Sequence, residues 1–338
     1  MFRPSIFRSI ALVAAFSWSG CLDVTVKTTV SPDGSCDRTV TFTSKSRNVP
    51  GSRVPIPTDS TWKIEWVVRA DSGDQYEYRA QKHFRTPEEL AAEYPAPKDS
   101  SGVRVFASIE RHFQWFYTYI DYCERFSSPR TYTLAPKSAF FTPEEGERYV
   151  RKEADSLVEQ KVQRWEGRNY FELYVRDIAS ALRMRPDGSA AAEQLLAARD
   201  SIFARAMILL EKKSHTIDKA EGRLGFLAGE MNLPMIRSLR AADDSSQKHF
   251  EQFTKSVSGP SENRTNIVRM PGLLIDANSP KVSASTVTWT IDFDRLHVAD
   301  AVMTARSRVV NVWAWWVTGA AGLVLVVLLL GRLVLRKR

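Results

Sequence analysis

The stretch DVTVKTTV, at residues 23–30, alternates apolar and polar side chains with the period of two that a half-buried β-strand shows. Val24 and Val26 fall on the same face of this strand. The next five residues, SPDGS at 31–35, are typical of a turn, and TVTFT at 39–43 alternates again. The sequence therefore predicts a β-hairpin, which is the first piece of a β framework.

Further strands are predicted on both sides of a long helical region. Residues 62–68 and 76–84 form a second hairpin around DSGD at 71–74, and strand patterns return at 266–275, 282–291 and 302–310. Between these groups, the apolar residues of 142–257 recur at helical spacing, with a sharp break at Pro186-Asp187-Gly188. The predicted fold class is α+β, with an antiparallel β framework from the N- and C-terminal segments and a helical insertion at about 142–257.

We place this whole framework in one domain, residues 21–310, because the N-terminal hairpins lack enough apolar faces to form a core alone. The tetrapeptide TPEE occurs at 86–89 and again at 142–145, and each copy predicts a helix start. Thr suits the N-cap, Pro fits the first turn, and the second Glu can close a capping box. The surrounding sequences differ, so we interpret the recurrence as shared helix-start chemistry.

Residues 103–126 are unusually aromatic, with seven aromatic side chains between Phe113 and Phe126. The alternation predicts one long bent strand, or two strands that meet at a bulge. Aromatic residues fall on both faces near Trp115–Tyr119, so the strand is expected to be buried on both sides or to line a cavity. Three interpretations follow: hydrophobic core, which we favour; a cavity wall of Trp115, Tyr117 and Tyr119 for an acyl chain or glycolipid; and a partner-binding edge.

The first twenty residues are typical of a signal peptide. Arg3 and Arg8 give a positive start, Ile10–Phe16 is a short apolar run, and small residues precede Cys21. A Cys after a small residue at this distance resembles the bacterial lipobox, although Trp18 stands where that pattern usually has Leu. The resemblance implies lipidation of Cys21, of the palmitate-containing kind, and cleavage before it. Ordinary cleavage with an unmodified Cys21 is the alternative.

The other end of the chain predicts a transmembrane helix at 311–331. Val312–Leu330 carries no charge, and as a helix it is about 28 Å long, close to the thickness of a hydrocarbon core. Trp313, Trp315 and Trp316 stand at its start, where an interfacial aromatic belt is expected. The tail at 332–338 is basic, which predicts a cytoplasmic C-terminus and a single pass through the cytoplasmic (inner) membrane, with the main domain on the periplasmic or extracellular face.

The formal net charge of +8 comes mostly from the two ends. Arg3 and Arg8 contribute +2 and the four cations after residue 310 contribute +4, so only +2 remains for residues 21–310. The basic balance therefore indicates membrane insertion and gives no support for nucleic-acid binding. The predicted partners are the membrane, through lipid and helix, and a lipid or an envelope protein.

Three cysteines leave an even pair if Cys21 carries lipid. Cys36 and Cys123 can then form a disulfide, which an oxidising exported space permits, or remain two separate thiols. Sequence alone cannot supply the geometry that would decide between these alternatives.

Two segments resemble LppM-type lipoproteins of mycobacteria and their relatives. The first is CLDVTV at 21–26 with VSPDGS at 30–35, and the second is MPG at 270–272 with AN at 277–278 and TVTW at 286–289. The order of parts also matches: lipobox, β-rich domain, C-terminal helix and short basic tail. The resemblance implies an exported α/β domain of the ligand- or lipid-associating kind without known catalytic residues, and it carries over no site residue.

The sequence contains no motif that predicts catalysis, a cofactor or a metal site. The five histidines form no HExxH and no close pair, Cys36 and Cys123 lack CxxC spacing, and GxSxG and P-loop patterns are absent. His112 with Glu110, Asp121 and Glu124 is the strongest polar group, in which His112 could act as a general base. We predict a non-enzymatic binding or assembly component of the bacterial envelope; a lipid or glycolipid carrier or sensor and an envelope enzyme using this His/carboxylate group are the alternatives.

Overall fold

The computed structural model describes residues 22–68, 75–94, 103–128, 132–211, 219–257 and 261–336. Within these ranges the chain divides into two compact units, and each is described by itself. The β unit contains residues 22–127, 262–292 and 301–336, and the helical unit contains 128–261 and 293–300. The α+β fold class is confirmed. The predicted domain boundaries stay a prediction.

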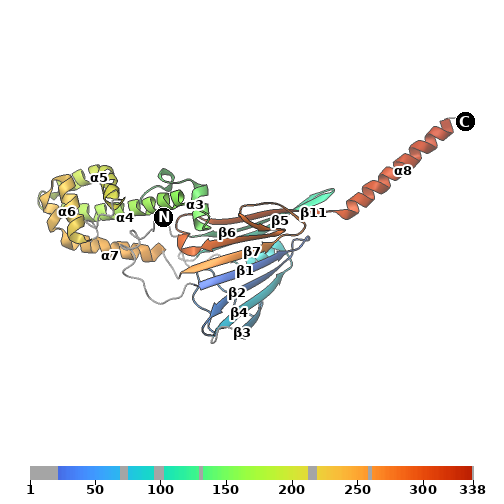
Figure 1. Cartoon of the computed structure of the whole chain (residues 1–338), viewed down its shortest axis with the longest axis horizontal. Coiled ribbons are helices and arrows are strands. Elements are labelled where there is room, and N and C mark those ends of the chain that lie inside the picture. The colour runs from blue at the N-terminus through green and yellow to red at the C-terminus, as the bar shows by residue number, and fades with distance from the viewer. Residues whose placement is uncertain are drawn as a thin grey trace. The chain divides into compact units, whose positions relative to one another are not determined.

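The first sheet of the β unit joins strands from both ends of the sequence. Its order is β3 (Lys63–Val68), β4 (Tyr76–Phe84), β2 (Cys36–Ser44), β1 (Leu22–Val30), β7 (Glu262–Arg269), β10 (Thr286–Asp292) and β9 (Lys281–Ser283). Figure 1 shows β1 in blue beside β7 in orange, far apart in sequence. This pairing is parallel, with Val24 opposite Arg264, whereas the other pairs in the sheet are antiparallel. A parallel pair needs a long connection, which the helical insertion supplies.

The second sheet has the order β5 (Arg104–Gln114), β6 (Tyr117–Ser127), β11 (Ala301–Val310) and β8 (Leu273–Ala277). The predicted single strand at 266–275 is wrong, because the chain leaves the first sheet after Arg269 and enters the second at Leu273. Pro271 cannot donate a ladder hydrogen bond. Gly272 has φ +68, and a Cβ there would lie 2.4 Å from the Arg308 carbonyl oxygen. The close approach of β11 therefore requires glycine at this crossing.

The aromatic stretch is neither one bent strand nor two strands joined at a bulge. β5 and β6 are adjacent antiparallel strands, with Gln114 paired to Tyr117, and Trp115 and Phe116 form the turn between them. The period of two restarts after this turn, which explains why aromatic residues fall on both faces in the sequence. The prediction of strand structure over residues 103–126 is thus confirmed, but the predicted connection is wrong.

The core of the β unit lies between the inner faces of the two sheets. On β1 and β2 the alternate residues Val24, Val26, Val40 and Phe42 are buried, as the period-two pattern predicts. Trp289 on β10 and Ile120 on β6 are fully buried. The short helix α2 (Pro87–Ala92), capped by the Thr86 hydroxyl, adds the buried Leu90. Burial of these alternate rows stabilises the unit and leaves the opposite rows facing outward.

The helical unit confirms a helical insertion. It contains α3 (Pro143–Val150), α4 (Ser156–Arg183), α5 (Gly188–Glu211), α6 (Ala220–Met231) and α7 (Arg240–Val257), with 3-10 turns at Lys137–Ala139, Pro234–Ser238 and Phe293–Arg295. Thr142 and Glu145 form the predicted capping box at α3. Asp187, with φ +59, marks the predicted break between α4 and α5. The core of the unit packs α4, α5 and α6 around Val175, Ile178, Leu182, Leu195, Ile202 and Leu227.

Residues 293–300 return from the β strands to the helical unit. His297 places Nε2 2.8 Å from Glu166 Oε1 and Nδ1 2.8 Å from the Asp294 carbonyl oxygen. Arg295 donates to the Tyr149 carbonyl oxygen at 3.1 Å. These contacts explain why a short segment between β10 and β11 belongs to the helical unit.

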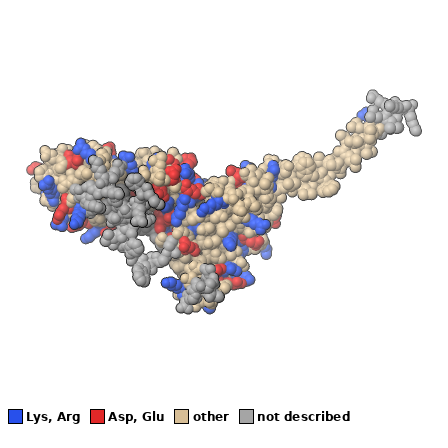
Figure 2. Space-filling view, in the orientation of Figure 1, with Lys and Arg blue, Asp and Glu red and all other residues tan. Residues whose placement is uncertain are grey.

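Only Asn311 separates the end of β11 from the start of α8 (Val312–Arg336). Among the described residues it is the one helix long and apolar enough to cross a membrane, over Val312–Leu330, and only 6% of that span is buried. Figure 2 shows hardly any charge colour along it before its C-terminal end. The predicted signal peptide, Cys21 and the last two residues of the basic tail lie outside the described residues.

Candidate functional site

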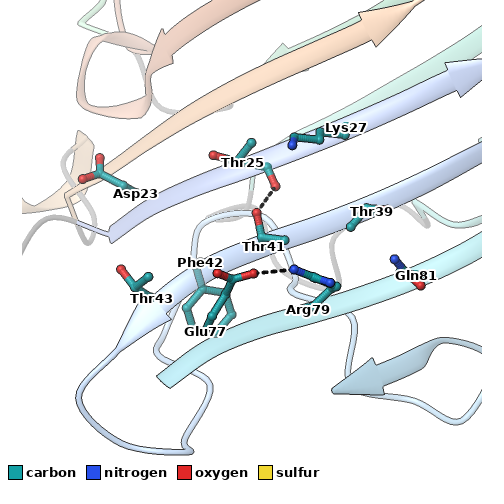
Figure 3. A pocket seen from close by; sticks show the side chains of 10 residues that line it. All are labelled: Asp23, Thr25, Lys27, Thr39, Thr41, Phe42, Thr43, Glu77, Arg79 and Gln81. Atoms are coloured by element: carbon teal, nitrogen blue, oxygen red, sulfur yellow. Dashed lines mark hydrogen bonds and ion pairs between the residues drawn. The ribbon is translucent and has the colours of Figure 1, made fainter. Parts of the chain in front are cut away.

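A polar groove lies on the outer face of the seven-stranded sheet (Figure 3). It has a volume of about 650 Å³ and is lined by side chains of β1, β2 and β4. Thr25 on β1 and Thr39, Thr41 and Thr43 on β2 alternate with buried residues, so their hydroxyls point away from the core. The groove therefore presents a row of hydroxyl groups from Thr25, Thr39, Thr41 and Thr43.

The charged groups of this groove balance one another. Arg79 donates to Glu77 Oε1 at 2.9 Å, and Asp23 Oδ1 accepts from the Asn263 amide at 3.1 Å. Lys27 and Gln81 add a cation and an amide to the lining. A surface of hydroxyls, an amide and equal numbers of opposite charges suits a polar ligand of low net charge better than a strongly anionic one.

A second hollow, of about 430 Å³, lies in the helical unit between residues 134–140 and the helices α4 and α5. One of the three arginines that line it, Arg168, donates through Nε to Glu172 Oε1 at 3.0 Å, also pairs with Asp200, and lies 4.9 Å over the ring of Phe203. Buried Asn169 accepts from the Ala135 backbone N–H at 2.9 Å and so holds the wall on α4. The charge of Arg168 is therefore compensated within the lining of the hollow.

A buried ion pair joins the two sheets inside the β unit. Arg38 on β2 lies 2.6 Å from Glu124 on β6, and both side chains are at most 1% exposed. Glu124 also accepts from the Tyr122 hydroxyl at 2.5 Å and from the Asn266 amide at 3.2 Å. Arg38 donates to Thr28 and to the Tyr94 hydroxyl as well. Burial disfavours the guanidinium charge, but Glu124, Tyr94 and Tyr122 together outweigh burial and raise the pKa of Arg38 well above its usual value.

The arrangement of this buried pair is structural. Both charges are paired and carry further hydrogen bonds, which is the condition under which charges persist in a core. Burial raises the pKa of Tyr122 well above its usual value, so the phenol stays protonated and donates to Glu124. Sequence analysis placed Glu124 with His112 and did not identify Arg38, Tyr94 or Asn266. For Arg38 and Asn266 the available signal was their position on the inward rows of β2 and β7, whereas Tyr94 follows α2 and had no such signal.

The β5–β6 turn is fastened to the start of α8 by Asn311. Its side-chain amide donates to the carbonyl oxygens of Gln114 at 2.9 Å and Trp115 at 3.3 Å. Its backbone N–H donates to the Phe116 carbonyl oxygen at 2.9 Å, and its Oδ1 accepts from the Thr118 hydroxyl at 2.9 Å. A single residue between strand and helix therefore satisfies the carbonyl groups of the whole turn.

Aromatic rings continue this junction. Trp115 contacts Trp313 at 5.2 Å between ring centroids, and its indole N–H donates to Thr318 Oγ1 at 2.9 Å. Phe113 stacks on Trp313 at 6.2 Å, and Phe116 meets Trp315 at 4.4 Å. We use the name aromatic foot for six aromatic residues: Phe113, Trp115, Phe116, Trp313, Trp315 and Trp316.

The residues predicted to line a cavity lie elsewhere. Trp115 is 47% exposed in the turn, and Tyr117 and Tyr119 are half-buried on the outward row of β6. Arg308 lies over the ring of Tyr117 at 4.5 Å, and Arg306 over that of Tyr119 at 5.3 Å. None of these aromatics lines either of the two hollows described above. The stretch divides into inward core residues, such as Tyr122 and Phe126, and the exposed turn.

Cys36 and Cys123 are free thiols in the structure. Cys36 shares the inward row of β2 with Arg38, whereas Cys123 lies on the outward row of β6, next to inward Glu124. The inward face of β2, which carries Cys36 and Arg38, packs against the inward face of β6, which carries Glu124. The Cys123 thiol therefore points away from Cys36, on the opposite side of β6. The alternative of two separate thiols fits this geometry. Burial raises the pKa of Cys36 to about 11 and also raises that of Cys123.

His112 does meet carboxylates, with Nε2 3.2 Å from Asp121 and 3.6 Å from Glu110. The three groups lie on the outward rows of β5 and β6, and half of the His112 side chain is exposed. Glu124 faces inward and is not part of this cluster. An exposed ion pair on an open strand face is the simpler interpretation. The described residues contain no group of three or more His, Cys, Asp or Glu side chains that could hold a metal ion.

Comparison with known proteins gives little beyond the resemblance seen in the sequence. No family model matches the chain, and no curated protein matches it. Among solved structures, the chain is weakly similar to the folded domain of the Mycobacterium tuberculosis LppM protein, determined by NMR. The two share 10% sequence identity with a TM-score of 0.31, over 88% of this chain and 95% of that chain. The chain is thus similar, at this low level, to a lipoprotein domain of the kind that its sequence resembles.

Proposed function

We propose that the chain is an exported lipoprotein of the bacterial cell envelope, anchored in the cytoplasmic membrane, that works as a binding component. The observation that carries the proposal is the hydroxyl-lined groove on a β unit that continues directly into an apolar helix. The groove would hold a ligand beside the membrane, where the helix keeps the protein. In this proposal α8 spans the membrane, Cys21 is lipidated and the groove faces the exported side.

The lining of the groove supports a hydroxylated ligand, such as a segment of envelope glycan. Thr hydroxyls both donate and accept hydrogen bonds, which matches the sugar hydroxyl. The Arg79–Glu77 pair and the Gln81 amide offer bidentate partners beside them.

Two alternatives have less support. A lipid carrier required a cavity lined by Trp115, Tyr117 and Tyr119, and these side chains lie at the exposed turn and on an outward row. An envelope enzyme required His112 and a carboxylate in a cleft, and this cluster lies on an open strand face. An assembly role remains compatible with the groove, because a protein partner could occupy it.

Binding of the full-length protein in nanodiscs to soluble fragments of cell-wall glycan tests the proposal. Thr41→Val and Arg79→Gln in the groove should each weaken binding several-fold, because the first removes a hydroxyl and the second a charged, bidentate donor. Thr290→Val is the matched control: it lies in the same cross-strand row and on the same face, but outside the groove. Equal affinity of all variants, or no binding by the wild type, would contradict a glycan-binding groove.

Lipidation and membrane topology are tested separately. Metabolic labelling with palmitate should mark the wild-type chain and not the Cys21→Ala variant. Protease added to spheroplasts should degrade the β unit and leave a short C-terminal fragment that contains α8. A protected β unit would contradict the proposed orientation, whatever the ligand.

A further inference from the structure

The aromatic foot is unusually exposed for so many large apolar side chains. Phe113 is 60% exposed and Trp115 47%, while Trp313, Trp315 and Trp316 are 50%, 51% and 76% exposed. Contiguous exposed apolar surface on a folded protein marks an interaction site. The foot is continuous with α8, whose next residues are those of the apolar span. Its occupant is therefore the same medium that covers the helix.

The hairpin turn reaches well along the helix. Trp115 donates its indole N–H to Thr318, which is six residues beyond Val312 and so about 9 Å further along the helix axis. The turn and the first two turns of α8 therefore occupy the same depth. If the hydrocarbon core began at Val312, the turn would lie inside it. The polar backbone groups of Trp115 and Phe116 would then be exposed to hydrocarbon, which is energetically costly.

The length of α8 allows a different boundary. From Thr318 to Arg336 the helix is about 28 Å long, again close to a hydrocarbon thickness. Arg332 then lies near the cytoplasmic end, where its long side chain can reach the headgroups. With this boundary the Trp residues of α8 and the aromatic residues of the turn lie together at the interface, which Trp favours because its ring is amphipathic.

We propose that the β5–β6 turn is a second membrane-contacting element, which inserts Phe113, Trp115 and Phe116 into the interface of the outer leaflet beside Trp313 and Trp315. The partner is the lipid surface itself. Asn311 fixes the turn to the helix, so the foot and α8 form one anchor and hold the β unit at a defined height. The inference rests on the proposed membrane anchorage and adds a contact that a helix alone would not make.

The test uses the full-length protein with Cys21→Ala and Cys123→Ser, so that α8 and the foot are its only membrane contacts, labelled at one introduced cysteine with an environment-sensitive fluorophore. The protein is reconstituted in liposomes of phosphatidylethanolamine and phosphatidylglycerol that contain shallow or deep spin-labelled lipid. A label at Phe113→Cys should be quenched several-fold more by the shallow quencher than by the deep one. Phe106→Cys is the matched control, because Phe106 lies on the same strand with 55% exposure, far from the turn, and its label should be unaffected.

A label at Leu323→Cys separates the two proposals. Quenching of this label by the deep quencher shows that α8 is inserted. If it is quenched while Phe113 and Phe106 behave alike, the foot is wrong and the anchorage stands. If Leu323 is not quenched, the anchorage itself is wrong, and the foot with it.

A measurement on the wild-type protein tests the same proposal without relying on the folding of variants. Hydroxyl-radical footprinting of the wild-type protein in nanodiscs should oxidise Phe113 several-fold more slowly than Phe106, although their exposed fractions in the protein are similar. Equal oxidation would overturn the proposal.

Discussion

Two hairpin turns of the β unit are built in opposite ways. The β1–β2 turn, at residues 31–35, contains the turn formers Pro32, Asp33 and Gly34; Asp33 accepts from the Ser35 backbone N–H at 3.0 Å, and Gly34 has φ +92. The β5–β6 turn consists of Trp115 and Phe116, neither of which has a positive φ. Its carbonyl groups are satisfied by Asn311, nearly two hundred residues later. The first turn is encoded locally, whereas the second depends on the tertiary fold.

The core also contains a contact between residues far apart in the sequence, the Arg38–Glu124 pair. Breaking this pair is expected to have the largest effect on stability. In Glu124→Gln, Arg38 stays buried without a counter-charge, so we expect a loss of about 3–5 kcal/mol in the free energy of unfolding. Denaturant unfolding in detergent, followed by Trp fluorescence, measures it. The Arg38→Met/Glu124→Gln double variant should be less destabilised than Glu124→Gln alone. If the double variant is the weaker protein, the pair is not acting as an isolated buried charge pair.

Asn311→Ala tests the remotely built turn directly. It removes two side-chain bonds to the turn carbonyls and the bond from Thr118, each worth about 1 kcal/mol, so the β unit should lose about 2–3 kcal/mol. Amide hydrogen exchange should rise at β5 and β6 near the turn and stay unchanged at β1 and β2. Asn278→Ala supplies a comparison, since Asn278 also bonds a backbone carbonyl, that of Val302, but away from this turn. Uniform exchange changes in the Asn311 variant would argue against a local role.

Gly34→Ala probes the locally built turn. Alanine is strained at φ +92, and its Cβ would lie 3.0 Å from Cδ of Arg111, so we expect a loss of about 1–3 kcal/mol. Gly51→Ala is the control, because a Cβ there meets nothing within 4 Å and Gly51 is not at positive φ. Similar unfolding midpoints for the two variants would show that the turn tolerates a side chain.

The sequence was sufficient where the signal is local. The strands β1, β2 and β4, the Thr86 and Thr142 caps and the break at Asp187 all follow from residues within a few positions of one another. The predicted strand at 282–291 is wrong, because it divides into the antiparallel strands β9 and β10. It was insufficient where a distant group decides the structure: the Arg308 carbonyl that forces a crossing at Gly272, and Asn311 at the aromatic turn. The groove was not predicted either. Thr is common in β-strands, so a row of Thr on the outward face does not by itself indicate a binding site.

The two thiols give a smaller effect, on reactivity rather than stability. At pH 8, iodoacetamide should modify Cys123 slowly and leave Cys36 unmodified until the protein unfolds, because burial raises the pKa of Cys36 to about 11. The folded state keeps this thiol protonated, so stability from Cys36 is present below its unfolded pKa and is lost between about pH 9 and 11. Cys36→Ser should flatten that part of the pH profile. If Cys36 and Cys123 react with iodoacetamide only after treatment with a reductant, the two residues form a disulfide.

The smallest effect is expected at Cys21, the other proposed anchor, which would join the β unit at the end opposite to α8. Leu22, the residue after Cys21, pairs with Glu262 at the start of β1. Nearby Arg264 lies over Phe126, whose partner Ala301 is nine residues before Val310, or about 30 Å along the strand. An acyl group at Cys21 would therefore reach the bilayer of α8 only if the strands run along the membrane surface.

Cys21→Ala should consequently leave the chain in the membrane fraction after alkaline carbonate extraction, because a transmembrane helix alone is an effectively permanent anchor. What should change is the tilt of the β unit, which the height of a fluorophore at Phe106→Cys above the bilayer reports in both backgrounds. Truncation after Val310 in the Cys21→Ala background is the control for release. Extraction of Cys21→Ala with α8 intact would mean that the lipid, and not the helix, holds the protein.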